Sequence, residues 1–281
     1  LTDGLQYADV LVYYDDMAVI TGTEQESPRL VWRRHCRAVR RVLRRCVKLG
    51  IKLGRAKCTF AVPAADWVDR NVSTDGFRKR GDQLTDVRDF PRPANSKALG
   101  RFLGLCGYYR GWIAGFAHIA APLRSLCKPR TPFVWSDDCQ TAFETLKTKV
   151  AEDVVLKVVD YGKAMVLETD ASDVAVGAVL SQKDAQGKLR PVKILSKALD
   201  AAQKNYTVTE RELLAIVWSV GRLRPLLLYL PFTVVTDHAN LQWLLNRPRT
   251  GRIGRWVLAL MEYSFTIVHK PGVKHVAPDA L

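Results

Sequence analysis

Four acidic residues fall where strands or helices are expected to begin or end: Asp170, Glu212, Asp237 and Asp279. Asp170 follows an apolar run at 165–167, and a small-residue turn then precedes a second apolar run at 174–180. This pattern predicts a buried strand, a turn and a paired strand. A carboxylate buried at a strand end is costly without a partner, and a metal ion is one such partner. The four acids therefore predict a carboxylate cage for divalent cations.

The chemistry that such a cage supports is cleavage of phosphodiester bonds. Two-metal cleavage requires several carboxylates around cations about 3.5–4 Å apart, where one ion activates water and the other stabilises the leaving oxygen. Hard oxygen ligands and substrate phosphates favour Mg²⁺, with Mn²⁺ as a substitute.

Glu212 has a structural alternative, because it could complete a capping box with Thr209 at the start of a helix. Thr207 and Glu210 have the same spacing and could form that box instead. In that case Glu212, expected in the first turn of the helix, is available as a ligand.

The other acids also have structural alternatives. Asp170 could begin an Asx-turn with Ser172, and Asp237 could cap a helix starting at Ala239. Asp279, near the end of the sequence, is the least supported ligand. Each alternative explains one acid but leaves the coincidence of the strand ends unexplained.

A second acidic pattern, Asp15-Asp16, lies between two apolar β-prone runs within residues 7–22. The pattern predicts a hairpin with both acids at its tip, where adjacent carboxylates repel each other unless a cation binds. The pair Asp137-Asp138 instead begins a helical pattern, where acids complement the helix N-terminus. We therefore expect metal binding at the first pair only.

The charge balance favours a polyanionic partner. Lys and Arg number 43 against 28 Asp and Glu, a net charge of +15, which favours nucleic acid over a basic protein without such a partner. Residues 29–48 carry nine basic residues and apolar residues at helical spacing. The sequence leaves open whether this basic helix face contacts phosphates, through Arg37, Arg41 and Arg44, or is only solvated.

Cysteine usage and hydropathy bear on the compartment. None of the six cysteines forms a C-x-x-C pair, so free thiols in a reducing compartment are expected rather than zinc or disulfides. No apolar run is long enough for a membrane span, and no signal peptide is recognisable. We expect a location in the cytoplasm, with the nucleus or a virus-like particle as alternatives. Without an initial Met, the chain is expected to be cut from a longer one.

The elements around the four acids follow one order. Strands are expected at 165–170, 174–180, 190–196, 232–237 and 263–269, and helices at 207–220, 240–245 and 253–262, with a last helix opening at Asp279. This is an α/β (α+β) arrangement, a mixed sheet with flanking helices of the ribonuclease H kind.

The middle of the chain is predicted to be helical. Residues 89–93 form a stiff extended link. Ser96 is expected to cap the following helix, and a second helix runs from the segment 133–136 to about residue 150. Residues 151–162 are expected to be a linker ending in a turn.

Two segments resemble reverse transcriptases. Tyr13-Tyr14-Asp15-Asp16 is similar to their Tyr-x-Asp-Asp motif, which implies that the two acids bind catalytic metals on a palm hairpin. The segment FLGLCGYYRGWI at 102–113 closely resembles the thumb and connection of gypsy-type reverse transcriptases.

A further resemblance covers residues 57–76. A strand at 57–60 and a hairpin at 67–76 are similar to a gypsy-type region that positions the primer end, which implies nucleic-acid contacts by Trp67 and Asn71. Val68-Asp69 replaces the usual Leu-Gly, and the added negative charge weakens the expectation of primer positioning.

The acidic segments resemble the ribonuclease H domain of gypsy-type retrotransposons. The matching segments are Thr169-Asp170-Ala171-Ser172, Glu210-Arg211-Glu212-Leu213-Leu214-Ala215, Thr236-Asp237-His238 and Pro278-Asp279-Ala280-Leu281. The resemblance implies that the four acids bind the catalytic metals. His275 and Pro278 depart from the usual Asn and Ala.

Two alternatives stay open. An integrase-like nuclease orders its acids Asp, Asp, Glu, whereas the order here is Asp, Glu, Asp, Asp. A decayed or domesticated copy would bind nucleic acid without catalysis, which the presence of all four acids disfavours.

The sequence thus predicts three parts: a palm remnant with the basic helix at 1–90, thumb and connection at 91–162, and a ribonuclease H-like domain at 163–281. The expected activity is Mg²⁺-dependent cleavage of the RNA strand of an RNA–DNA hybrid, with polymerase activity lost. Expected partners are hybrid, primer–template and upstream polyprotein segments. The oligomeric state is not predicted.

Overall fold

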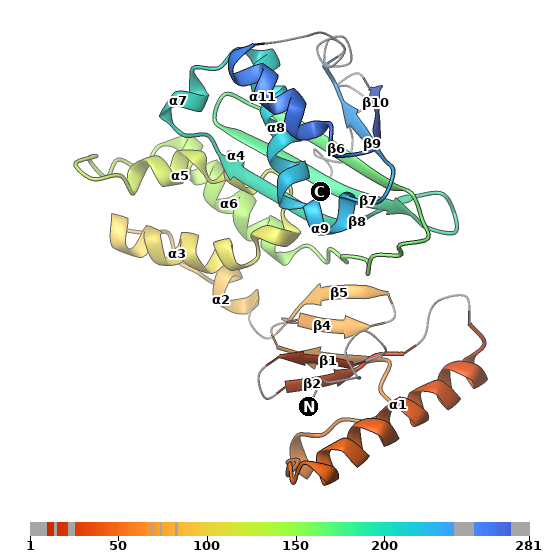
Figure 1. The fold of residues 1–281 in the computed structure, drawn as a ribbon. Helices are drawn as coiled ribbons and strands as arrows, with labels where there is room; N and C mark the ends of the chain where they lie inside the picture. The colour runs from red at the N-terminus through yellow and green to blue at the C-terminus, as the bar shows by residue number, and fades with distance from the viewer. Residues whose placement is uncertain are drawn as a thin grey trace. The chain divides into compact units, whose positions relative to one another are not determined.

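A computed structural model describes residues 10–13, 16–21, 26–68, 70–73, 75–81, 84–238 and 250–270. The chain divides into two compact units, Leu1–Arg80 and Gly81–Leu281. Each unit has its own hydrophobic core. Figure 1 shows the helices and strands of both units.

The first unit contains the expected hairpin and basic helix. Strands β1 (Val10–Tyr13) and β2 (Asp16–Val19) are antiparallel, with Tyr13 opposite Asp16. Helix α1 (Pro28–Lys48) packs its buried Val42 and Cys46 against Val10 of β1. The tip residues Tyr14 and Asp15 lie outside the described residues.

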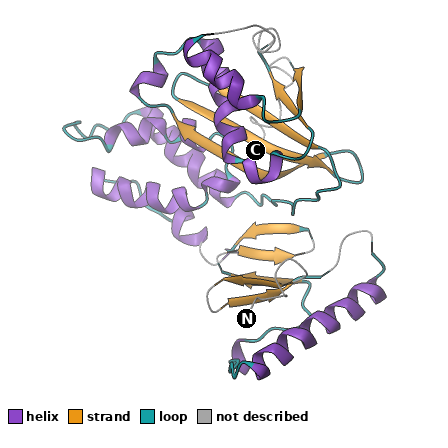
Figure 2. Ribbon diagram, viewed as in Figure 1, coloured by secondary structure: helices purple, strands orange, loops and turns teal. Residues whose placement is uncertain are grey.

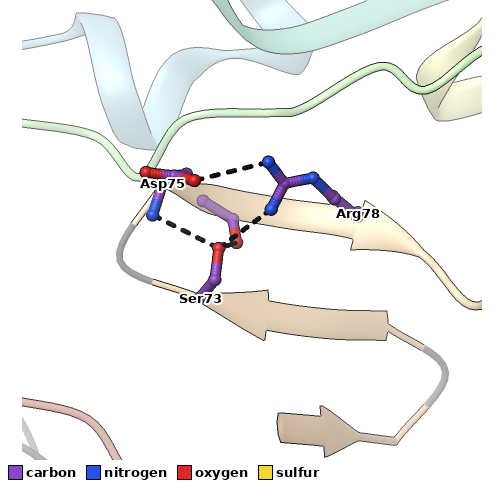
Figure 3. A network of polar contacts seen from close by, with 4 residues as sticks. Ser73, Asp75 and Arg78 are labelled. Atoms are coloured by element: carbon purple, nitrogen blue, oxygen red, sulfur yellow. Dashed lines mark hydrogen bonds and ion pairs between the residues drawn. The ribbon is translucent and has the colours of Figure 1, made fainter. Parts of the chain in front are cut away.

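A three-stranded meander completes this unit: β3 (Ala64–Trp67), β4 (Arg70–Ser73) and β5 (Gly76–Lys79). At its β4–β5 end, Arg78 donates to Ser73 Oγ (3.2 Å) and pairs with Asp75 (3.4 Å), as Figure 3 shows. The strand expected at 57–60 is wrong. Lys57 ends the 3₁₀ turn η1 (Arg55–Lys57), and the next three residues join no described ladder.

The second unit opens with helices: α2 (Leu84–Arg88), α3 (Ser96–Tyr108), η3 (Arg110–Trp112), α4 (Phe116–Ile119), α5 (Ala121–Leu126) and α6 (Asp137–Ala151). Leu99, Phe102 and Cys106 of α3 are fully buried and form an apolar stripe along the helix. The expected cap at Ser96 is off by one residue, because the Asn95 side chain accepts the Ala98 N–H (2.9 Å).

A five-stranded mixed sheet follows, as predicted: β6 (Met165–Ala171), β7 (Ala175–Lys183), β8 (Leu189–Ala198), β9 (Phe232–Thr236) and β10 (Phe265–His269). The strand order is β10-β9-β6-β7-β8. Strand β9 pairs parallel with both β6 and β10, whereas β7 pairs antiparallel with β6 and β8. The parallel pairing brings the ends of β6 and β9 to the same edge.

Helices lie on both faces of this sheet (Figures 1 and 2). The helices on one side are α7 (Ala201–Lys204), α8 (Val208–Arg222), α9 (Arg224–Leu227) and α11 (Gly251–Leu260). On α8, Leu213 and Ile216 pack on Met165 and Leu167 of β6. On the opposite face, the backbone N–H of Ala117 in α4 donates to a serine hydroxyl of β8 (2.7 Å). The expected helix at 240–245 lies outside the described residues.

Candidate metal centre at one edge of the five-stranded sheet

Asp170 and Asp237 come from adjacent parallel strands. Asp170 is the next-to-last residue of β6, and Asp237 directly follows β9. The pairing of β6 with β9 places Glu168 opposite Val235, and two more residues in this register bring Asp170 level with Asp237. Both aspartates are exposed, which corrects the expectation that Asp170 is buried. Two carboxylates thus face solvent at one edge of the sheet.

Glu212 is the buried acid of this group. It lies on α8, where only 4% of the residue is exposed. The backbone N–H of Ala171, the neighbour of Asp170, donates to its carboxylate. Its second oxygen, Oε2, is buried without a hydrogen-bond partner. An unsatisfied buried carboxylate oxygen is costly, so a cation here would relieve it.

The charges of Asp170 and Asp237 act on Glu212. Burial, together with the negative charges of Asp237 and then Asp170, raises the pKa of Glu212 to about 8, and Arg211 only partly opposes this. Like charges have this effect when they are near one another. A divalent cation would favour the ionised form of Glu212 and neutralise the repulsion.

The donor set fits a hard divalent cation, because it consists of carboxylate oxygens. Within the described part of the chain, no group of three or more His, Cys, Asp or Glu side chains is already gathered closely enough to hold a metal. The predicted fourth ligand, Asp279, and the His275 and Pro278 departures lie outside the described residues.

The capping box at the start of α8 decides between the two interpretations of Glu212. Thr207 caps the helix, and its Oγ1 accepts from the N–H of Glu210 while the Glu210 carboxylate accepts from the N–H of Thr207. Glu212 therefore has no part in the cap. It lies just beyond the first turn, not within it, because the helix begins at Val208.

Thr209 contacts the segment that carries Asp237. Its Oγ1 lies 3.0 Å from Nε2 of His238. On the other side of β9, Nε2 of His269 donates to the backbone carbonyl of Asp237 (2.9 Å). Asp237 is thus held between α8 and β10. Local sequence patterns do not predict these contacts, because they join residues far apart in the chain.

Ser172 links the turn after Asp170 to the helical segment. Its Oγ accepts from the N–H of Ala175 (3.0 Å) and lies 3.2 Å from Nδ1 of His118 in α4. The observed turn contacts are therefore made by Ser172. His118 is a neighbour of the site that no sequence signal revealed.

Comparisons with known proteins show which family the chain resembles. The family described as the RNase H-like domain found in reverse transcriptase matches residues 160–263. The Pol polyprotein of transposon 297 from Drosophila melanogaster is 35% identical over 277 residues, which cover 96% of this chain and 25% of the relative. The Tf2-3 transposon polyprotein of Schizosaccharomyces pombe is 34% identical, over 97% of this chain and 20% of the relative. The chain belongs to the reverse transcriptase and RNase H-like region of LTR-retrotransposon Pol polyproteins.

The solved structures agree on the fold. A foamy viral protease–reverse transcriptase in complex with an RNA/DNA hybrid has a TM-score of 0.77 at 19% identity, over 97% of this chain and 37% of the other. This retrotransposon chain spans about a quarter or less of its curated relatives. No helix among the described residues is long and apolar enough to cross a membrane.

The predicted metal ligands of the first unit belong to the β1–β2 hairpin. Asp16 is exposed at the start of β2, and Asp15 lies outside the described residues. Among the residues that the structure describes, no group of three metal-binding side chains surrounds Asp16.

The predicted nucleic-acid contacts also lie in the first unit. Arg37, Arg41 and Arg44 are all exposed on α1. Trp67 is half-buried at the end of β3, and Asn71 of β4 donates to the carboxylate of Asp66 (2.9 Å). Asp69, the departure at the primer hairpin, lies outside the described residues.

Proposed function

We propose that this retrotransposon chain cleaves the RNA strand of an RNA–DNA hybrid in the presence of Mg²⁺, with Mn²⁺ as a substitute. The observation that carries the proposal is Glu212, a buried carboxylate with an unpartnered Oε2 that lies close to Asp170 and Asp237. A protein stabilises such an arrangement most readily by binding a cation.

Asp170, Glu212 and Asp237 would hold the cations, and Asp279 is proposed as a fourth ligand from its motif. The bound ions supply an activated water and charge stabilisation for the leaving oxygen. The chain itself orients the ligands: the Ala171 N–H fixes one oxygen of Glu212, and His269 fixes the backbone of Asp237.

The substrate class follows from charge and from likeness. The chain carries a net charge of +15, which favours binding to nucleic acid. The similar foamy viral structures were solved with double-stranded DNA and with an RNA/DNA hybrid. We propose that Arg37, Arg41 and Arg44 contribute phosphate contacts, with Trp67 and Asn71 near the primer.

DNA polymerisation is not proposed for this chain alone, because Asp16, the one acid of the Asp15-Asp16 pair that the structure describes, has no buried acid beside it comparable to Glu212 among the described residues. Phosphoryl transfer depends on positioning and charge stabilisation by the metal pair, so one exposed acid is insufficient. We propose that this chain acts together with other segments of a polyprotein, as the names of its relatives indicate.

The test is single-turnover cleavage of a hybrid with a labelled RNA strand, with Mg²⁺ or with EDTA. We expect the chain to cleave with Mg²⁺ only. Asp170→Asn should slow cleavage by more than about a hundredfold, since it removes charge at the reacting centre. Asp16→Asn is the matched control and should cleave at the parent rate. Equal cleavage by Asp170→Asn and the parent would overturn the assignment.

A further inference from the structure

An ion pair joins two helices next to the candidate metal centre. Nη2 of Arg252, at the start of α11, lies 2.5 Å from Oε1 of Glu210, in the first turn of α8. The Glu210 side chain is 17% exposed and the Arg252 side chain 39%.

Two aromatic rings fix the direction of the arginine. The guanidinium carbon of Arg252 lies 3.8 Å from the ring centroid of Tyr206 and 5.6 Å from that of Trp256. The two rings are themselves 5.9 Å apart. Stacking on aromatic faces restricts a guanidinium and strengthens its attraction to the rings. The two rings therefore restrict the orientation of Arg252 independently of its pairing with Glu210.

Glu210 transmits this restraint to the helix start. Its Oε2 accepts from the backbone N–H (2.9 Å) and the hydroxyl (3.1 Å) of Thr207, while Oε1 binds Arg252. One carboxylate thus closes the capping box of α8 and ties it to α11. We call Tyr206, Glu210, Arg252 and Trp256 the bracket.

The neighbouring turn requires such a restraint. Glu212 follows Glu210 by two residues and is 4% exposed, with its Oε2 buried and unpartnered. A buried oxygen without a partner is costly, and movement of this turn of α8 away from the sheet edge would expose it to water when no cation is bound. The backbone N–H of Ala171 holds the Glu212 carboxylate directly.

We propose that Arg252 is a positioning residue for the metal centre: through Glu210 it holds the first turns of α8 so that Glu212 stays beside Asp170 and Asp237. This inference rests on the proposed function, because it assigns the bracket to the same cation site. Arg252 touches neither metal nor substrate in this role.

The chain offers a matched control at the opposite end of the same helix. Arg224 of α9 pairs with Glu262, just after α11, and this pair is the more exposed one, at 50% and 55% of the two side chains. It ties α11 to the unit without touching α8's first turn. If the Arg252–Glu210 pair only stabilises the fold, Arg252→Ala and Arg224→Ala should have the same effects on hydrogen exchange, Mn²⁺ affinity and cleavage.

The experiment compares the whole chain with Arg252→Ala, Arg252→Lys and Arg224→Ala. Hydrogen exchange of amides 207–213 is measured without cations, Mn²⁺ affinity by calorimetry, and hybrid cleavage as kcat and KM. For Arg252→Ala we expect about tenfold faster exchange, a roughly tenfold loss of Mn²⁺ affinity, and a similar fall in kcat at unchanged KM, as for residues that orient ligands. Arg252→Lys should recover part of each loss, and Arg224→Ala should stay within about twofold of the parent.

A double-variant cycle tests the route through Glu210. If Arg252 acts through this carboxylate, Arg252→Ala should change little further in a Glu210→Ala background. Arg252→Ala and Arg224→Ala with equal exchange and equal Mn²⁺ affinity would overturn the positioning role. A parent chain that binds no Mn²⁺ and cleaves no hybrid would instead overturn the proposed function, and the exchange measurement would still show whether the bracket holds α8.

Discussion

The sequence predicts metal binding at two acidic regions of the chain, and the two differ in structure. In the first unit, Asp16 begins a strand of a two-stranded hairpin and is exposed to solvent. In the second, Asp170, Glu212 and Asp237 come from two parallel strands and a helix, and their charges interact at one edge of the sheet. The second arrangement combines a buried acid with exposed ones, whereas the described part of the first shows an exposed acid.

The difference shows what makes a carboxylate useful to a metal site. Adjacent acids such as Asp15-Asp16 are close because they are consecutive in the chain, and this closeness requires no particular fold. The sheet acids are close because β6 and β9 pair in parallel and α8 packs over β6. This second kind of proximity is accompanied by a buried oxygen without a partner, Glu212 Oε2.

The largest effect that separates the two regions is a pH dependence of stability in cation-free buffer. The pKa of Glu212 is raised from 4.5 to about 8 in the folded chain. The folded state therefore binds a proton that the unfolded state releases, so stability falls as pH rises from about 4.5 to 8 and then levels off. The loss should reach a few kcal/mol, roughly 1.4 per pKa unit at most.

Urea unfolding of the chain at pH 5, 7 and 8.5 in EDTA measures this. Glu212→Gln should flatten the curve and be the more stable form at pH 8.5, because its neutral amide carries no burial penalty for charge. Asp16→Asn should leave the parent slope in place. If the unfolding free energy of Glu212→Gln depends on pH as in the parent, Glu212 is not the group that causes this dependence, and the contrast between the two regions is wrong.

A smaller effect concerns the first unit, whose proposed contribution is electrostatic. Neutralising Arg37, Arg41 and Arg44 to Gln should reduce the slope of log affinity for hybrid against log salt by at most roughly three units, if each contacts one phosphate. Arg34→Gln is a control, since Arg34 already pairs with Glu26 (2.6 Å). Fluorescence anisotropy between about 50 and 200 mM salt measures the slope of log affinity against log salt. An unchanged slope in the triple variant would show that the basic face of α1 is only solvated.

Local patterns predicted much of the fold. Alternating and helical apolar spacing located all five strands of the large sheet and α8, because these elements bury one continuous face. The spacing of Thr207 and Glu210 also predicted the capping box, in which Glu212 takes no part. Short-range chemistry was sufficient for these features.

What local patterns missed depends on distant partners. The strand expected at 57–60 has no described neighbour to pair with, and the cap moved to Asn95 because its side chain reaches the Ala98 N–H. The contact of Arg252 with Glu210 joins residues on separate helices, and that of His118 with Ser172 joins a helix to a turn. Spacing along the chain carries no signal for such contacts.

Proton release on Mn²⁺ binding tests the cation site most directly. At pH 7 the raised pKa keeps Glu212 largely protonated, and a cation must displace that proton. Calorimetric titrations of the whole chain in two buffers of different ionisation enthalpy should show release of close to one proton. This release should disappear in Glu212→Gln and persist in Asp16→Asn. Mn²⁺ binding without proton release, or with the same release in Glu212→Gln, would contradict a cation site built around Glu212.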